Sequence, residues 1–173
     1  MTPPRERTLG AVLAGGRSSR FGSDKAVALW EGKRLLDRSR ALLEPWCDEV
    51  VVVGRDGGVA DLPRPDLGPL GGMAGALDAA ASRGIRCVLT ISCDMPRLPD
   101  GLIEALLRRA PAYCADAPVL GHWPAALGAQ LLGWIETAPD RSVRGWANSI
   151  GALPIPSPAP LANINTPADL MAL

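Results

Sequence analysis

The hydrophobic pattern of this chain changes period several times, which predicts strands and helices in alternation. Three short apolar runs are rich in β-branched residues and end in glycine or proline, so each is typical of a strand. These runs are residues 8–16, 48–54 and 86–96. The run at 48–54 is apolar on both faces, which favours a central position in a parallel sheet.

A helical spacing of apolar residues follows each of these runs. The first helix is expected from 34 to 44, and an alanine-rich helix is expected at 72–84. A third helix is expected at 100–110, where Asp100 has the residue type of an N-cap.

The pattern is weaker after residue 110. Short helices are expected at 128–136 and 142–150. The proline-rich stretch 153–160 is extended and cannot lie in a central strand. A last helix is expected at 165–173, with Thr166 as its N-cap.

The alternation of strands and helices predicts an α/β protein. We expect a single-domain, Rossmann-like three-layer sandwich with a mostly parallel sheet, formed by residues 1–173. The polar start, residues 1–7, lacks the apolar centre of a signal peptide and is expected to be disordered. A cytoplasmic protein is therefore expected.

Composition excludes several classes of protein. Eighteen basic residues balance eighteen acidic ones, so no net field attracts nucleic acid or a membrane surface. No apolar run approaches the roughly 20 residues that a membrane helix needs. The four cysteines show no CxxC spacing and His122 is the only histidine, so we expect no zinc site and a structural histidine.

The segment after the first predicted strand carries the clearest chemistry. Residues 13–25, LAGGRSSRFGSDK, contain three glycines and three positive charges. Glycines let backbone N–H groups approach an anion, and cations balance phosphate charge at the carboxyl end of a strand. The segment matches neither the Walker A spacing nor GxGxxG. The alternative is a solvated basic loop without a ligand.

Further segments extend this pattern along nearly the whole chain. With LAGGRSSRFGSDKA, they resemble the motifs of the molybdenum cofactor guanylyltransferase family, small nucleotidyltransferases that share a glycosyltransferase-A-like fold. They are DLGPLGGM, SCDMPRLP, GHWPAAL, DRSVRGW and NINTPADL, in chain order. Gly15 and Gly16 favour the guanylyltransferase branch, because the cytidylyltransferases more often have LAAG.

The resemblance implies a reaction. GMP is transferred from GTP to the terminal phosphate of molybdopterin with Mg²⁺, and pyrophosphate is released. The alternatives are a molybdopterin cytidylyltransferase or another sugar- or alditol-phosphate nucleotidyltransferase, and a non-catalytic adaptor that binds the nucleotide or the cofactor. Contact with cofactor-inserting or acceptor molybdoenzyme proteins is also implied, whereas nucleic acid and membranes are not expected as partners.

The resemblance also assigns roles to residues of the opening motif and of the third predicted strand. Asp94 matches the metal-binding aspartate; alternatively it caps the turn before Pro96. Lys25 matches the phosphate-binding lysine; alternatively it pairs with Asp24 or Glu31. The remaining nucleotide ligands are Leu13, Ala14, Gly15 and Gly16 through their backbone, Arg20 as a second phosphate ligand, and Arg17 as a weaker one.

The other matches are less complete. Asp66 is matched to the nucleotide-contacting aspartate by its place before GPLGG, and a turn aspartate is the equal alternative. The family tends to have an Asn after the second strand, where this chain has Gly54, Arg55 and Asp56 but no Asn.

Four residues are expected on the acceptor side. They are Arg141, Arg144, Asn163 and Asn165. A solvated helix face explains the arginines equally well, and a helix cap explains Asn165. An exposed Trp123 or Trp146 would be able to stack on a pterin ring.

Overall fold

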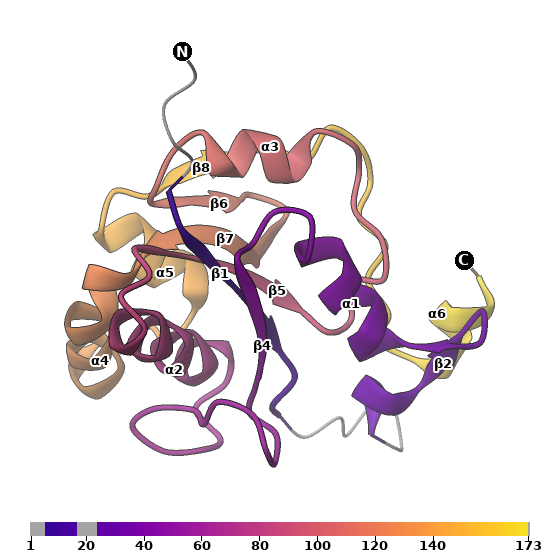
Figure 1. Ribbon diagram of the computed structural model, residues 1–173, viewed down its shortest axis with the longest axis horizontal. Helices are drawn as coiled ribbons and strands as arrows, with labels where there is room; N and C mark the ends of the chain where they lie inside the picture. Colours follow the sequence, from indigo (N-terminus) through magenta and orange to yellow (C-terminus); the bar gives the residue numbers. More distant parts are fainter. Residues whose placement is uncertain (1–5, 17–23, 173) are drawn as a thin grey trace.

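The computed structural model describes residues 6–16 and 24–172 and has the predicted α/β architecture (Figure 1). The strands are β1 (Thr8–Leu13), β2 (Leu29–Trp30), β3 (Lys33–Arg34), β4 (Glu49–Val53), β5 (Cys87–Ser92), β6 (Ala112–Cys114), β7 (Ala117–Pro124) and β8 (Leu153–Ile155). The helices are η1 (Lys25–Val27), α1 (Leu35–Leu43), α2 (Pro69–Ser82), α3 (Leu102–Leu107), η2 (Ala125–Leu127), α4 (Gly128–Thr137), α5 (Val143–Ser149) and α6 (Pro167–Met171).

The central sheet has six strands in the order β4-β1-β5-β7-β6-β8. β1 pairs in parallel with β4 and with β5, and β6 pairs in parallel with β8. Only β7 runs against its two neighbours, so the prediction of a mostly parallel sheet is confirmed. The short strands β2 and β3 form a separate hairpin.

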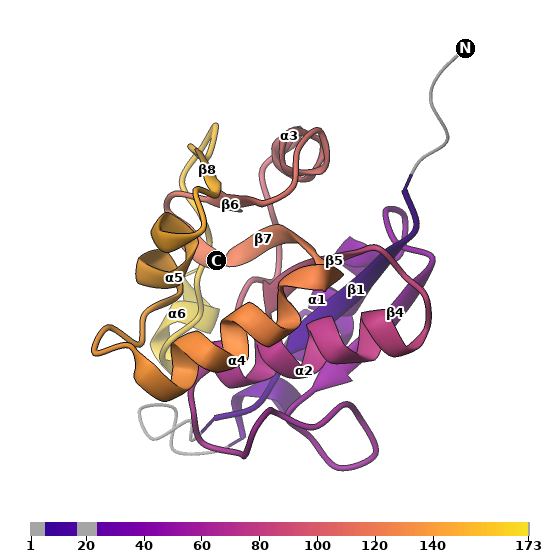
Figure 2. The ribbon, with the colours of Figure 1, turned by 90° about the vertical axis from the view of Figure 1, so that its left-hand side faces the viewer.

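Alternate residues of β1 serve two hydrophobic clusters, one on each face of the sheet. Leu9, Ala11 and Leu13 pack with α2, α4 and α5, whereas Val12 and Ala14 pack with α1 and α3. Figure 2 shows α2 and α4 side by side over the first face. The sheet therefore lies between two helical layers, which is the expected three-layer sandwich.

Two details of the sequence prediction were wrong. β4 is an edge strand, and Val50, Val51 and Val52 are only half-buried. Its apolar character comes from helices on both faces, because α1 and α2 reach the edge of the sheet; strand order is not encoded in hydropathy. The N-cap of α3 is Gly101, in a left-handed conformation, rather than Asp100.

The second half of the sheet is built around aromatic packing. Trp123 and Trp146 are fully buried, and their ring centroids lie 4.9 Å apart. Tyr113 stacks on Trp123 at 6.4 Å. Neither tryptophan is exposed, so the condition for stacking on a pterin ring is not met and both side chains are part of the core.

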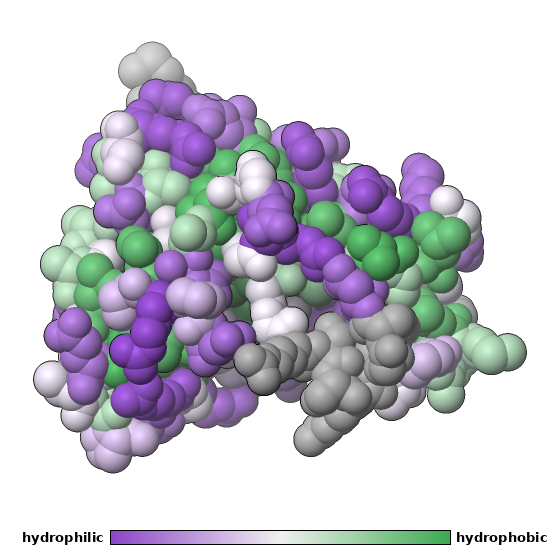
Figure 3. Space-filling model, turned by 90° about the horizontal axis from the view of Figure 1, so that it is seen from below, coloured by the Kyte–Doolittle hydropathy of each residue, from purple (hydrophilic) through white to green (hydrophobic). Residues whose placement is uncertain are grey.

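The strands of the parallel half present one edge to ligands. The carboxyl ends of β1, β4 and β5 lie together on the lower side of Figure 1. Figure 3 views this side and shows apolar surface on the right as well as near the centre. Leu29 in β2 and Met171 in α6 are large apolar side chains that are exposed. Among the described residues, no helix has the length and apolar character to cross a bilayer.

Candidate active site

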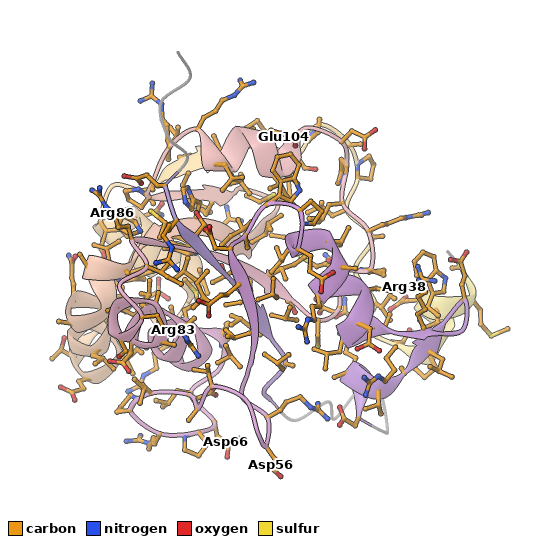
Figure 4. All side chains as sticks on the ribbon, viewed as in Figure 1. Arg38, Asp56, Asp66, Arg83, Arg86 and Glu104 are labelled. Atoms are coloured by element: carbon orange, nitrogen blue, oxygen red, sulfur yellow. The ribbon has the colours of Figure 1, made fainter. Side chains whose placement is uncertain are left out.

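The backbone ends of three strands are tied together at this edge. The N–H of Ala14 donates to the carbonyl of Val53 at 3.0 Å, and the N–H of Cys93 donates to that of Leu13 at 3.2 Å. The parallel register therefore places the glycines after β1 beside the carboxylate after β5, far apart in sequence. Figure 4 shows Asp56 and Asp66 on this same side, whereas Arg86 and Glu104 lie on the opposite side.

Lys25 and Asp94 face each other at the centre of this edge. The Lys25 ammonium donates to Asp94 Oδ2 at 2.9 Å, and the exposed fractions of the two side chains are 14% and 22%. Lys25 also donates to Asn165 Oδ1 at 3.3 Å. The sequence suggested Asp24 or Glu31 as an alternative partner for Lys25, but the structure pairs Lys25 with Asp94.

Buried hydrogen bonds hold the segment that carries Asp94. The N–H of Ile164 donates to the Asp94 carbonyl at 3.0 Å, and Ile164 is fully buried. The hydroxyl of Ser39, from α1, donates to the carbonyls of Ser92 and Met95, each at 3.3 Å. The backbone on both sides of Asp94 is thus fixed before any ligand arrives.

A divalent cation fits this site only together with a phosphate ligand. Among the described residues, no group of three His, Cys, Asp or Glu side chains gathers closely enough to bind a metal. Mg²⁺ is commonly held by one or two carboxylates, water and substrate phosphates. Asp94 is the carboxylate that can hold such a cation, provided that Lys25 releases it.

A second carboxylate lies beside the glycines of the opening motif. Asp61 follows β4 in sequence, and its Oδ1 is buried without a hydrogen-bond partner in the described structure. A Cβ added at Gly54 would lie 3.0 Å from Asp61 Oδ1, and one at Gly15 would lie 3.4 Å from Oδ2. The glycines therefore leave the space that this carboxylate occupies, and a small cavity lined by Leu13, Gly16 and Asp61 opens there.

The environment of Asp61 disfavours its charged form. Burial raises the pKa of Asp61 above its ordinary value, and the nearby carboxylate of Asp66 raises this pKa further. A buried acceptor without a donor costs free energy, so a ligand that brings N–H groups gains from meeting it.

Asp66 was predicted from the sequence as a nucleotide ligand, whereas Asp61 was not. Asp66 is exposed, has a φ of 63° and lines the same small cavity. Asp66 is thus near the site, but Asp61 is the carboxylate that touches the glycine-lined space. A signal was present, since Asp61 interrupts the apolar segment from Val59 to Leu62.

An Asn at position 54, after β4, would have no room in this backbone. Gly54 has a φ of +81°, and an added Cβ would lie 2.6 Å from the Cα of Gly15. The side chain that occupies this region is that of Asp61 instead.

The other residues predicted to bind the nucleotide or the acceptor differ in where they lie. Arg20 and Arg17 lie outside the described residues. Asn165 and Asn163 are exposed beside buried Ile164, and Asn165 contacts Lys25 at the centre of the site. Thr166, not Asn165, caps α6.

Of the two arginines expected on the acceptor side, Arg141 lies just before α5 and Arg144 lies in its first turn. Arg141 is exposed, and Arg144 donates to the carbonyl of Ala115 at 2.7 Å. His122 is buried in β7 and its Nδ1 contacts the carbonyl of Arg109 at 3.0 Å. Burial lowers the pKa of His122, which agrees with the structural position expected for it.

The sequence matches the model of a known protein family over most of its length. Residues 10–152 match the family described as "MobA-like NTP transferase domain". The chain belongs to the MobA-like NTP transferase family. The matched region includes Lys25, Asp61 and Asp94, whereas Ile164 and Asn165, which contact this site, lie beyond it.

Individual members of the MobA-like family are similar over nearly the full chain. The molybdenum cofactor guanylyltransferase of Rhizobium leguminosarum bv. trifolii is 35% identical, and the alignment covers 96% of this chain and 91% of that protein. The enzyme of that name from Rhodobacter capsulatus is also 35% identical, with 95% and 93% covered.

Solved structures confirm the MobA-like fold. Molybdopterin-guanine dinucleotide biosynthesis protein A from Archaeoglobus fulgidus has a TM-score of 0.72 at 22% identity, with 95% of each chain covered. The 2-C-methyl-D-erythritol 4-phosphate cytidylyltransferase from Thermus thermophilus has a TM-score of 0.62 at 16% identity, over 94% of this chain and 95% of the other. At these identities the likeness concerns the fold alone.

Proposed function

We propose that this protein is a molybdenum cofactor guanylyltransferase, which transfers GMP from GTP to the terminal phosphate of molybdopterin. Its relatives of that name align over nearly the whole chain. The observation that carries the proposal is the Lys25–Asp94 pair at the carboxyl edge, beside the glycines that follow β1. At this edge an ammonium group that can bind phosphates lies next to a carboxylate that can bind a metal ion.

The reaction needs alignment and charge balance more than covalent help. An oxygen of the acceptor phosphate attacks the α-phosphorus of GTP, the bond from the α-phosphorus to the bridging oxygen breaks, and pyrophosphate leaves with that oxygen. Lys25 binds the phosphates as a point charge, with Arg20 as a further ligand proposed from the motif. Asn165 keeps the Lys25 ammonium at the centre of the site.

We propose Mg²⁺ as the metal and Asp94 as its ligand from the protein. The bound cation would screen the negative charges of GTP and the acceptor phosphate. Asp94 must exchange its ammonium partner for the cation, and Lys25 must turn to the phosphates. The bonds from Ile164 and Ser39 hold the Asp94 segment in place during this exchange.

Asp61 supports guanine as the base. The Watson–Crick edge of guanine presents two adjacent N–H donors, N1–H and the exocyclic amine, which match the two oxygens of a carboxylate. Cytosine and adenine each present an acceptor beside one amine, and this acceptor would meet Asp61 unfavourably. Leu13, Ala14, Gly15 and Gly16 are proposed to add backbone contacts to the guanine and ribose.

The acceptor side is proposed from sequence matches. Arg141, Arg144, Asn163 and Asn165 are assigned there. Since the reaction uses the cytoplasmic GTP pool, we also propose a cytoplasmic location and transient contact with the proteins that receive the product.

The test is a turnover assay with molybdopterin and Mg²⁺, in which GTP, CTP and ATP compete. We expect molybdopterin guanine dinucleotide and pyrophosphate in equal amounts, with GTP preferred by at least about tenfold. Preference for CTP would assign the chain to the cytidylyltransferases. Binding of GTP without pyrophosphate release would indicate an adaptor, and turnover only with sugar or alditol phosphates would change the acceptor.

A further inference from the structure

The reaction described above leaves one charged pair at the edge without a role. Arg55, directly after Gly54, reaches the segment that carries Lys25 and donates two N–H groups to the carboxylate of Asp24. The bond from Nη1 to Oδ1 is 2.8 Å long, and the second joins Nη2 to Oδ2. This two-point contact fixes the orientation of both side chains.

Asp24 also determines where Lys25 lies. Its Oδ1 accepts from the N–H of Ala26 at 3.1 Å and caps the short helix η1, which begins at Lys25. Ala26 is 1% exposed and packs in the cluster between the sheet and α1. Lys25 therefore lies between two anchored neighbours. Arg55 holds the carboxylate of Asp24, and the hydrophobic core holds the side chain of Ala26.

The same carboxylate is an electrostatic problem for a triphosphate. Asp24 is adjacent to the lysine that would bind phosphates, and a carboxylate there repels an incoming anion. Hydrogen bonds from Arg55 lower the pKa of Asp24, so this carboxyl group is ionised at neutral pH. The guanidinium offsets the charge of Asp24, with Asp56 and Cys93 also in its surroundings.

We propose that Arg55 is a positioning residue for the nucleoside triphosphate. It holds Asp24, which caps η1 and thereby fixes the backbone of Lys25 at the phosphate site, and it cancels a carboxylate charge that would repel the phosphates. The inference rests on the proposed function, because the triphosphate belongs to that reaction. It adds a residue of the β4 loop to the phosphate site, which the opening motif alone does not contain.

The test compares Arg55→Gln, Asp24→Asn and the double variant. We expect Arg55→Gln to weaken MgGTP binding roughly tenfold in calorimetry, and to raise the KM for GTP by a similar factor with kcat little changed. Asp24→Asn retains an acceptor for the Ala26 N–H and removes the repulsive charge, so its affinity should stay within about threefold of the unchanged protein.

The double variant decides the mechanism. With the Asp24 charge gone, loss of Arg55 should cost less than about threefold, so Asp24→Asn rescues Arg55→Gln. A residue that only supported the fold would not be rescued by removing its partner's charge. Arg64→Gln, an exposed arginine of the loop between β4 and α2, is the matched control for net charge and should bind MgGTP like the unchanged protein.

A second measurement is independent of the proposed function. Amide hydrogen exchange of the nucleotide-free protein should become about tenfold faster at Ala26 in Arg55→Gln and stay unchanged in Arg64→Gln. If the unchanged protein bound no nucleoside triphosphate, the proposed function would fail. Amide hydrogen exchange at Ala26 would then be the only test of whether Arg55 anchors the Lys25 segment. Unchanged exchange, or an unrescued double variant in a protein that binds GTP, overturns the inference.

Discussion

The phosphate region and the base region proposed for the nucleotide differ in how their charges are paired. In the phosphate region each of the charges described is paired: Lys25 with Asp94, and Arg55 with Asp24. In the base region Asp61 lies against glycines with one oxygen lacking a hydrogen-bond partner in the described structure. One region must rearrange its ion pairs to bind, whereas the other already contains a buried acceptor that needs donors.

The difference shows how each region would obtain its selectivity. Exchange of ion-pair partners favours a ligand that brings both a cation and phosphates, because either alone would leave a charge uncompensated. A carboxylate without a donor favours a base with two adjacent N–H groups, because any other base leaves that acceptor unsatisfied. In the proposed site the phosphate region would therefore select the metal–triphosphate complex, and the base region would select the base.

The largest effect is expected from breaking the phosphate region at Asp94. Asp94→Ala should lower Mg²⁺-dependent turnover by about 10³-fold, since it removes the carboxylate proposed to hold the cation. Pyrophosphate release measures this effect. Circular dichroism should remain unchanged, because the bonds from Ile164 and Ser39 to this segment use backbone carbonyls. Turnover near that of the unchanged protein would remove Asp94 from the mechanism.

Loss of Lys25 should have the next largest effect. Lys25→Ala should weaken GTP binding about 10²-fold, because it removes a phosphate ligand and leaves Asp94 facing the phosphates without a partner. Calorimetry with MgGTP measures the loss. Lys25→Arg, which retains the charge, is the matched control and should recover part of the affinity; equal losses in both variants would contradict a role for the charge.

In the base region, Asp61→Asn should separate selectivity from stability. The preference for GTP over ATP should fall by roughly 10- to 100-fold, the range for a hydrogen bond to a charged group. The free energy of unfolding should rise by about 0.5–1 kcal/mol, because a buried charge is removed. Competition binding and urea unfolding measure the two effects. Asp66→Asn is the matched control, and a larger loss of selectivity there would restore the assignment made from sequence.

The smallest effect is a pH dependence confined to the base region. The folded-state pKa of Asp61 is raised by burial and then by Asp66, so acidification protonates Asp61 before an ordinary aspartate. The preference for GTP should therefore decrease as pH falls towards this raised pKa.

The same shift has a defined sign for stability. Because the folded pKa exceeds the unfolded one, this residue's contribution to stability rises as pH falls between the two values. In Asp61→Asn, neither the preference for GTP nor the free energy of unfolding should show this pH dependence when both are measured between the two pKa values. A pH profile identical to that of the unchanged protein would argue against Asp61 as the titrating group.

The sequence was informative where one strand or one motif was sufficient. The runs that became β1 and β5 are apolar and end at the ligand edge, and Lys25 and Asp94 were predicted from the motifs that contain them. β6 and β7 were not predicted as a pair because they are interrupted by turn residues and include Gly121 and His122. Strand order was also inaccessible, which is why β4 was expected in the centre.

The position of Asp61 shows why part of the candidate site was not predictable from the sequence. Its environment is made by Gly15 after β1, Gly54 after β4 and Gly72 in α2, three segments that meet only in the folded chain. Proximity in sequence to the GPLGG motif favoured Asp66 instead. The Arg55–Asp24 pair was missed for the same reason, because its two residues belong to different loops.

The backbone bond from Ile164 to Asp94 relates the site to the order in which the chain is made. A ribosome releases β1, β4 and β5 well before residues 163–165, so a nascent chain can form the parallel half of its sheet early. At that stage Asp94 lacks its backbone anchor and Lys25 lacks its contact with Asn165. The catalytic edge is therefore completed late in synthesis, and truncation before Ile164 would leave a folded sheet with an unfinished active site.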